Sequence, residues 1–387
     1  MRLFWSFLML SCAAVLAKDY RGAQFFGFAQ FEKFERTNTA DAVVLTSPKI
    51  EAAIYWNELV ASWNFRGDAQ IGLEVEARAF YPERETKWYH LGKWSLAPGR
   101  FPRESVRAQQ DDDGAVATDI LKLKHKARVL QLRVTLRGVN EVAPLKFLGV
   151  ALCDSEIVGE AATGLPLNGD SWNSSLPKDE RRNSRRRDEL RESLSVLPPN
   201  KEAWGKTLDV PRQSQMAFEE GGDWCSPTAV TMLLSYWAEK LSRPDLRHDV
   251  PEVAHTVNDP NWPGTGNWSF NMAFAGSHDG IRAYVARLSD VSELEDWIAA
   301  GVPVAVSVRY GILKGAENPG NGHLVVCVGF DQEGNIVVND PGRTEVRQTY
   351  SRENLIKAWA RSENTVYLIY PEDWKVPEDR FGHWTQF

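Results

Sequence analysis

The sequence predicts a multidomain protein with an N-terminal all-β sandwich or jelly roll, followed by a C-terminal α+β domain. Two observations support this division. Apolar and polar residues alternate over much of residues 18–155, as they do in half-buried strands, whereas residues 204–375 mix strand and helix periods. The 387 residues are also enough for two or three domains, and 43% of them are hydrophobic, which suffices for ordinary cores.

An export signal is predicted at residues 1–17. Arg2 supplies a positive charge, residues 3–10 are apolar, and small residues end at Ala17, after which we expect cleavage. Lipid attachment at Cys12 is the alternative, but Leu10 is a poor match to the motif that such attachment requires. No later apolar run is long enough to span a bilayer. We therefore expect a secreted, periplasmic or cell-surface protein with no transmembrane segment in the mature chain.

Residues 18–155 are predicted to form a β-sandwich of about eight strands. Apolar residues occupy every second position in residues 71–79 and 130–136. Turn signals separate such segments, at Gly67, Gly99, Gly114 and Gly138. The ligand of this accessory domain, a glycan or a protein if there is one, stays open.

Residues 156–203 are predicted to be a charged linker or an exposed charged helix. The run from Lys178 to Glu192 is charged almost throughout and contains both signs, and Pro198-Pro199 follows it. A basic docking patch or a processing site at residues 185–187 is the alternative, which the interleaved acidic residues disfavour. The formal net charge of −7 likewise argues against a nucleic acid as partner.

The C-terminal domain is predicted over residues 204–375, with residues 376–387 as a tail. Cys225 is expected just before its first helix, where Ser226 suits the cap and Pro227 suits the first helical position. One side of this helix is expected to be buried, because apolar residues recur there at helical spacing: Val230, Leu233, Leu234 and Trp237.

The remaining elements of this domain follow an α+β order. Residues 258–271 are predicted to be an irregular loop. Ser292 and Glu295 form a capping-box pattern at the start of a helix that Gly301 ends. A helix is predicted at residues 351–360, and strands at 302–308, 323–330, 335–339 and 365–370, with residues 331–334 as a hairpin turn.

Cys225 has the setting of a reactive thiol. A helix N-terminus carries partial positive charge, which favours the thiolate over the thiol. Removal of the export signal would leave Cys153, Cys225 and Cys327, an odd number, so at least one thiol stays free. Cys153 and Cys327 could pair, but their apolar, strand-like surroundings favour buried free thiols.

Among the seven histidines, His323 is the candidate base for this thiol. It follows a flexible Gly-Asn-Gly segment and opens a strongly apolar strand, where a polar ring needs a partner. Asp340 ends the return strand of the predicted hairpin, so antiparallel pairing should place its carboxylate close to His323. Asn339 competes for this role, but its side chain should point to the opposite face of the strand. Gln213 and Gln215 are candidate donors to an oxyanion, and spacing does not choose between them.

Three motifs in order resemble the peptidase C39-like family, papain-like cysteine peptidases related to bacteriocin-leader processing domains. They lie within residues 204–372 and read LDVPRQSQM, WCSPTAVTMLLSYW and GHLVVCVGFDQEGNIVVNDP. The resemblance implies a papain-like fold with a catalytic triad, in which Cys225 is the nucleophile, His323 the general base and Asp340 the residue that orients it. It also implies that Gln215 lines the oxyanion hole. The sequence departs from the family's frequent Cys-Gly-Pro, since Ser226 follows the cysteine.

The segment GTGNWSFN at residues 264–271 resembles exported members of the same family. Trp268 and Asn271 in it, together with Trp224, are candidate substrate contacts; a loop pinned by buried aromatic residues is the alternative. No metal-binding Cys-x-x-Cys or His-x-x-x-His spacing and no phosphate-binding loop occur, so no cofactor is predicted. We expect an exported cysteine peptidase or amidase acting on a peptide or protein. The alternatives are a catalytically inactive binding protein and a transglutaminase-type acyltransferase.

Overall fold

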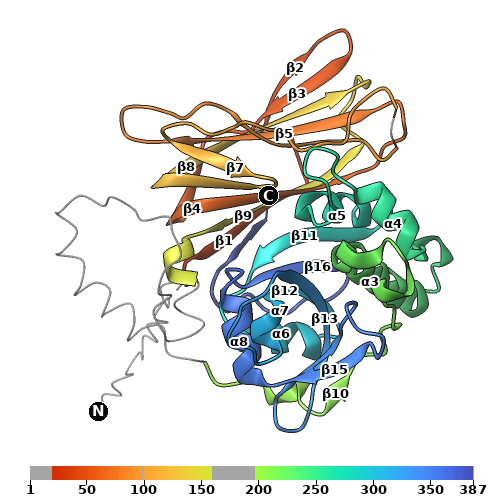
Figure 1. The fold of residues 1–387 in the computed structure, drawn as a ribbon. Coiled ribbons are helices and arrows are strands. Elements are labelled where there is room, and N and C mark those ends of the chain that lie inside the picture. Colours follow the sequence, from red (N-terminus) through yellow and green to blue (C-terminus); the bar gives the residue numbers. More distant parts are fainter. Residues whose placement is uncertain (1–19, 98, 159–196, 387) are drawn as a thin grey trace, which may run out of the picture.

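The computed structural model describes residues 20–97, 99–158 and 197–386 (Figure 1). The predicted export signal, Cys12 and the charged run at residues 178–192 lie outside these ranges. Two β-sheets dominate the described part, one in each half of the chain. No helix within these ranges is long and apolar enough to cross a membrane.

The N-terminal half forms a sheet domain, as predicted. Its strands are joined by hydrogen bonds into one sheet, because the long strands β4 and β8 each pair with several neighbours. A jelly roll is therefore not confirmed. The strands are β1 (Ala23–Phe28), β2 (Glu35–Asn38), β3 (Ala42–Thr46), β4 (Ile50–Phe65), β5 (Gly72–Phe80), β6 (Tyr89–Trp94), β7 (Gly114–Ala117), β8 (Ile120–Arg137) and β9 (Leu145–Cys153).

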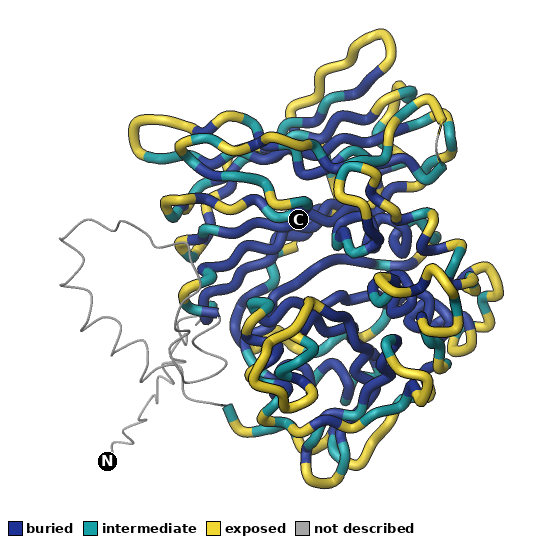
Figure 2. Tube along the Cα trace, viewed as in Figure 1, coloured by how far each residue is buried: buried dark blue, intermediate teal, exposed yellow. Residues whose placement is uncertain are grey.

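Buried residues run along the strands of both sheets (Figure 2). The predicted alternation in burial is seen over much of β8, whereas β5 is buried over most of its length. Their apolar side chains face the core. On the other face of β5, Glu74 and Glu76 are also buried, because Arg137 and Arg133 on β8 pair with them at 3.1 and 2.6 Å. His90 on β6 adds a contact of 2.8 Å to Glu74. Pairs of opposite charge across the strands thus bury the polar face of β5, which the period-two pattern predicts to be exposed to solvent.

The C-terminal half is an α+β region, as predicted. One antiparallel sheet has the order β11-β16-β12-β13-β14-β15, with β10 paired to β13. Its strands are β10 (Lys206–Thr207), β11 (Ile281–Arg287), β12 (Val304–Arg309), β13 (Gly322–Phe330), β14 (Ile336–Asn339), β15 (Arg347–Tyr350) and β16 (Thr365–Pro371). The α-helices are α3 (Cys225–Leu241), α4 (Val250–Val257), α5 (Trp268–Ala275), α6 (Val291–Ala299), α7 (Tyr310–Leu313) and α8 (Arg352–Ala360).

Three helix starts differ from the sequence prediction. Helix α3 begins at Cys225 itself with Trp224 in the cap position, so Ser226 is not the cap, and residues 226–238 are buried on every side. Asp290 is the cap of α6, and its carboxylate accepts from the backbone N–H of Ser292. The capping-box pattern had placed the cap at Ser292 instead. Part of the predicted loop at 258–271 is helical, since α5 begins at Trp268.

The last residues of the chain are not a separate tail. Strand β17 (Trp384–Gln386) pairs in parallel with β1 of the N-terminal sheet. The indole N–H of Trp384 donates to the hydroxyl of Tyr284 on β11, at 3.1 Å. The end of the C-terminal half thereby extends the N-terminal sheet, a long-range pairing that no local sequence pattern announces.

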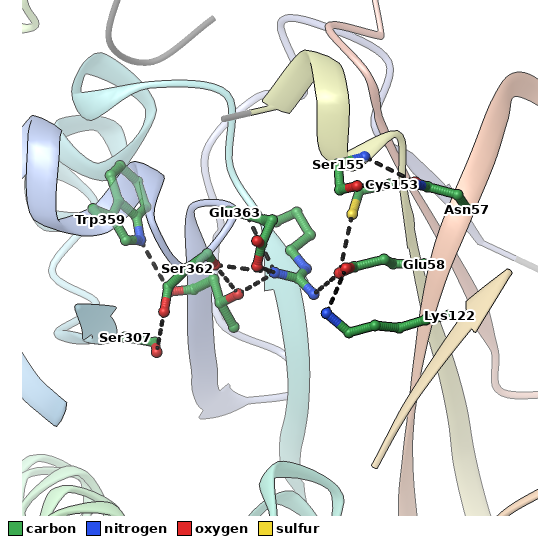
Figure 3. A network of polar contacts seen from close by, with 11 residues as sticks. Asn57, Glu58, Lys122, Cys153, Ser155, Ser307, Trp359, Ser362 and Glu363 are labelled. Atoms are coloured by element: carbon green, nitrogen blue, oxygen red, sulfur yellow. Dashed lines mark hydrogen bonds and ion pairs between the residues drawn. The ribbon is translucent and has the colours of Figure 1, made fainter. Parts of the chain in front are cut away.

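A buried network of charges joins the two halves (Figure 3). Glu58 on β4 accepts from Arg287 on β11 at 3.2 Å and pairs with Lys122 on β8 at 2.9 Å. Arg287 also pairs with Glu363 at 3.2 Å, and its side chain is only 2% exposed. Buried charges persist only where they are paired. The two halves are therefore linked by an ion network as well as by the packing of α5 and β11 on β4.

Candidate active site

Cys225 occupies the first position of α3, where backbone N–H groups have no partner within the helix. The short 3-10 helix η4 (Gly221–Asp223) leads into it. Gly221 lies so close to Gln215 that an added Cβ would stand 1.9 Å from the Gln215 carbonyl oxygen, so only glycine fits there. Cys225, a residue of intermediate exposure, is thus held at the start of α3 by a close turn of the chain.

His323 lies near the start of β13, beside the Cys225 end of α3, which packs on this strand. The predicted hairpin is confirmed: β13 and β14 are antiparallel, with Val326 opposite Asn339. This register brings the Asp340 carboxylate to the ring, and Oδ1 lies 2.7 Å from Nε2 of His323. Since Asp340 occupies Nε2, Nδ1 is the ring nitrogen left for the Cys225 thiol.

The electrostatics of Cys225 and His323 favour the ionised forms of both groups. Burial alone would raise the pKa of Cys225, but its hydrogen bond to His323 and the charge of that ring bring the pKa below its ordinary value. Burial would lower the pKa of His323, yet its contacts with Asp340 and Cys225 raise it to about 9. A thiolate and an imidazolium are therefore stabilised as a pair near neutral pH.

Asp340 is fully buried and accepts four hydrogen bonds. Oδ1 accepts from His323 and from the backbone N–H of Gly342 at 2.9 Å. Oδ2 accepts from the hydroxyls of Tyr310 at 3.0 Å and Tyr350 at 2.7 Å. Burial alone would raise the pKa of Asp340, but these donors, His323 foremost, lower it. The carboxylate is thereby kept ionised and fixed in direction.

The two tyrosines were not identified from the sequence. Tyr310 also faces His323, with ring centroids 4.2 Å apart. Tyr350 ends β15, the strand next to β14. Neither belongs to a motif with fixed spacing, and the sheet order that brings β15 beside Asp340 is not local information. Asn339, the competitor of Asp340, donates to the carbonyl oxygens of Val210 and Pro211 and so faces away from His323.

Gln215 and Gln213 have different surroundings. Nε2 of Gln215 donates to the carbonyl oxygens of Gly221 at 2.7 Å and Gly222 at 3.0 Å, and its backbone N–H donates to Pro341, next to Asp340. Its Oε1 is buried and has no hydrogen-bond partner among the described residues. Gln213 instead contacts Ser235 within α3, at 3.4 Å. Gln215 is thus the glutamine beside the approach to Cys225, although both of its amide hydrogens are engaged.

The three weaker candidates for substrate contact lie in packed surroundings. Trp224 is 6% exposed, and its ring packs against Phe218 and His255. Asn271 is fully buried, and its amide donates to the carbonyl oxygens of Thr265 and Asn267. The backbone N–H of Trp268 donates to Asp119 of the N-terminal domain. These contacts agree with the alternative reading, in which buried aromatic residues fix the segment in place. Trp224 and Asn271 are too buried to contact a substrate.

The other thiols lie away from this site. Cys153 and Cys327 are buried and free, on β9 and β13. Burial raises the pKa of Cys153 well above its ordinary value, and also that of Cys327. Over residues 20–97, 99–158 and 197–386, no three His, Cys, Asp or Glu side chains are grouped so as to hold a metal ion.

Comparison with known proteins covers both halves of the chain. Residues 207–367 match the Peptidase_C39 like family, and residues 26–151 match the peptidase C39 N-terminal domain. No curated protein matches the sequence. A crystal structure of a C39-like peptidase from Bacillus anthracis is similar over 42% of this chain and 97% of that chain, with 18% identity and a TM-score of 0.33. An agarase, AgWH50C, is similar over 51% of this chain and 35% of that chain, with 12% identity and a TM-score of 0.15.

Neither solved structure is similar enough to show function. The two family matches are more informative, because they fall in chain order on the two folded halves and leave the charged segment between them unmatched. The protein belongs to the peptidase C39-like family, with a peptidase C39 N-terminal domain preceding the C39-like domain.

Proposed function

We propose that this protein is a cysteine peptidase or amidase that cleaves a peptide or amide bond through a thioester on Cys225. The observation that carries the proposal is the continuous contact from Cys225 to His323 to Asp340, with a lowered pKa for the thiol and a raised pKa for the imidazole. A nucleophile, a base and a group that orients the base are the parts that acyl transfer requires.

In the proposed mechanism, the Cys225 thiolate attacks the substrate carbonyl carbon and forms a C–S bond. The carbonyl oxygen becomes an oxyanion next to the unpaired N–H groups of α3 and next to Gln215. His323 then gives the proton on Nδ1 to the leaving nitrogen as the C–N bond breaks. A water molecule attacks the thioester while His323 takes its proton, and cleavage of the C–S bond releases the acid and restores the thiolate.

The role of Gln215 in this scheme requires a small change of geometry. Its amide hydrogens point to Gly221 and Gly222. An oxyanion is a stronger acceptor than a neutral carbonyl, so one of these hydrogens would turn to the intermediate when it forms.

We also propose that the enzyme acts outside the cytoplasm, on the basis of the export signal at residues 1–17. Expression of the full chain in a bacterial host, followed by mass determination of the exported protein, tests this. A mature protein that begins at Lys18 is expected. An uncleaved chain found only in the cytoplasm contradicts the proposal.

Turnover of a fluorogenic peptide library, with the Cys225→Ala variant as control, tests the proposed reaction. We expect cleavage by the unaltered protein and none by the variant. Addition of a primary amine distinguishes hydrolysis from acyl transfer, because an acyltransferase would form the amide in preference to the acid. No cleavage of any peptide, or cleavage that survives in Cys225→Ala, contradicts the proposal.

A further inference from the structure

An exposed aromatic side chain lies beside the approach to Cys225. Trp262 is 44% exposed, one of three large hydrophobic residues with such exposure in the described ranges. A Cβ at Gly264 would stand 3.3 Å from Cζ3 of Trp262 and 3.5 Å from Oδ2 of Asp223. The edge of the indole ring and the carboxylate therefore both lie against Gly264, which is itself buried.

The segment that carries Trp262 is fixed relative to Cys225. The hydroxyl of Thr265 donates to the carbonyl oxygen of Asp223 at 2.8 Å. The backbone of Gly264 pairs with Asp259, whose carboxylate accepts from Asn267 inside the protein. Asp223 itself is two residues before Cys225, so their Cα atoms are at most about 7 Å apart. The backbone of Asp223 thus lies within the length of about two substrate residues of the proposed nucleophile, and Trp262 lies beside Asp223 across Gly264.

The chain segment that carries Asp223 is negative, whereas Arg103 and Arg107 of the N-terminal domain bind backbone carbonyl oxygens of His255, Asn258 and Asn261 on the neighbouring segment. The carboxylate of Asp223 is exposed and has no hydrogen-bond or ion-pair partner among the residues that the structure describes. Glu219 and Glu220 nearby are also exposed, and the sequence from Gln213 to Glu239 contains no lysine or arginine. A cationic side chain of a substrate would be attracted to this side of Cys225.

The other side of the site has the opposite charge. The ammonium of Lys314 lies 3.9 Å from the ring centroid of Tyr310, which faces His323. Arg343 is exposed and follows Gly342, the residue that donates to Asp340. Because His323 protonates the leaving nitrogen, the leaving half of the substrate lies on this side. The acyl half then lies toward Asp223 and Trp262.

We propose that Asp223 and Trp262 form a subsite for a lysine or arginine side chain on the acyl side of the scissile bond; this rests on the proposed peptidase function. The carboxylate supplies an ion pair, and the exposed indole face supplies a cation–π contact. Gly264 and Gly266 let the indole ring lie close against the backbone, since a Cβ at either would crowd the ring; the side chain of the substrate would meet the exposed part of the indole. Substrates with a basic residue at one of the last two positions before the cleaved bond are thereby favoured.

Tripeptidyl chloromethyl ketones test this subsite directly, because the residue that carries the ketone is the one on the acyl side. The Cys225 thiolate displaces chloride and forms a thioether, which mass spectrometry assigns to the residue. Lysine is compared with norleucine, which lacks only the amine, at each of the last two positions. Alkylation by iodoacetamide normalises every rate for the intrinsic reactivity of the thiol. Rates are measured at pH 9, where an ordinary thiol is also largely ionised and lysine keeps its charge.

We expect the lysine reagent to react about tenfold faster than its norleucine counterpart at one of the two positions, the combined size of an exposed ion pair and a cation–π contact. Asp223→Asn and Trp262→Leu should each reduce this ratio to about threefold or less. Glu219→Gln, a matched change of a neighbouring exposed carboxylate, should leave it intact.

A ratio near one in the unaltered protein, or a ratio that survives Asp223→Asn, overturns the subsite. Failure of the proposed function is seen separately. If iodoacetamide shows no activated thiol at neutral pH, the peptidase proposal fails, while the ratio at pH 9 still decides whether a cationic residue is recognised.

Discussion

Nε2 of His323 lies 2.7 Å from Oδ1 of Asp340, and the hairpin of β13 and β14 sets this distance. Both residues stand at the open end of the hairpin, so a short stretch of chain delivers base and carboxylate together. The negative charge of Asp340 is in turn stabilised by hydrogen bonds from two tyrosine hydroxyls on other elements. The pair is therefore assembled locally and stabilised by the whole sheet.

Asp340→Asn should separate the electrostatic role of Asp340 from its shape. Burial lowers the pKa of His323 and the carboxylate raises it, so the neutral amide should bring it down from about 9. Because the ion pair exists only between the pKa of Cys225 and that of His323, the alkaline limb of kcat/KM should move to lower pH. The rate at neutral pH should fall by about a hundredfold or more. Profiles of kcat/KM against pH for both proteins measure this, and an unmoved alkaline limb contradicts it.

Tyr350→Phe should destabilise the protein, because it removes one of the four donors to a buried carboxylate. A hydrogen bond to a charged group contributes about 1.5–3 kcal/mol, and a loss of this size is expected in the free energy of unfolding. Denaturant titration measures it. Tyr81→Phe is the matched control, because that hydroxyl donates to a backbone carbonyl in an exposed contact. Equal losses in the two variants would argue against a special role for Tyr350.

Gln215→Ala should reduce kcat by about a hundredfold, with less effect on KM, if the amide donates to the oxyanion. Gln213→Ala is the control from the same motif, since that side chain contacts Ser235 instead. Steady-state kinetics on one peptide distinguish the two. A similar small effect in both variants would mean that Gln215 serves only to hold Gly221 and Gly222 in place.

Glu58→Gln should loosen the junction of the two halves. The change leaves Arg287 and Lys122 without their shared carboxylate in a buried setting. Breaking such a pair costs about 3–5 kcal/mol, which should appear as a lower midpoint of thermal or denaturant unfolding. Glu51→Gln is the control, because its 3.6 Å pair with Arg128 is exposed. If the unfolding midpoint decreases by the same amount in both variants, the buried network does not add to stability.

The sequence was most informative where structure depends on neighbours along the chain. The strands at 323–330 and 335–339 and their turn placed Asp340 beside His323, because pairing across a short turn follows from chain order. Burial in β8 followed its period-two pattern for the same reason, whereas β5 is buried on both faces because its glutamates pair with arginines of β8. The helix with Cys225 was also expected, but its first residue was not, since Trp224 makes no side-chain cap that a pattern could reveal.

Features that join distant segments could not be predicted. The pairing of β17 with β1 connects the two ends of the chain and has no local signal. The Tyr310 and Tyr350 contacts with Asp340 depend on the order of strands in the sheet. Trp268 and Asn271 were predicted as substrate contacts and Trp262 was not, because the exposure of a side chain depends on which other segments cover it. Residue type alone carries no such information.

The central claim is that Cys225 and His323 form a thiolate–imidazolium pair. Alkylation by iodoacetamide across a pH series, with the labelled cysteine identified by mass spectrometry, measures this most directly. We predict fast labelling of Cys225 below pH 7, lost in His323→Ala and kept in His255→Ala, which alters an exposed imidazole. The buried Cys153 and Cys327 of the same folded protein should stay unlabelled. If Cys225 reacts no faster than an ordinary thiol with a pKa of about 8.5, the account is contradicted.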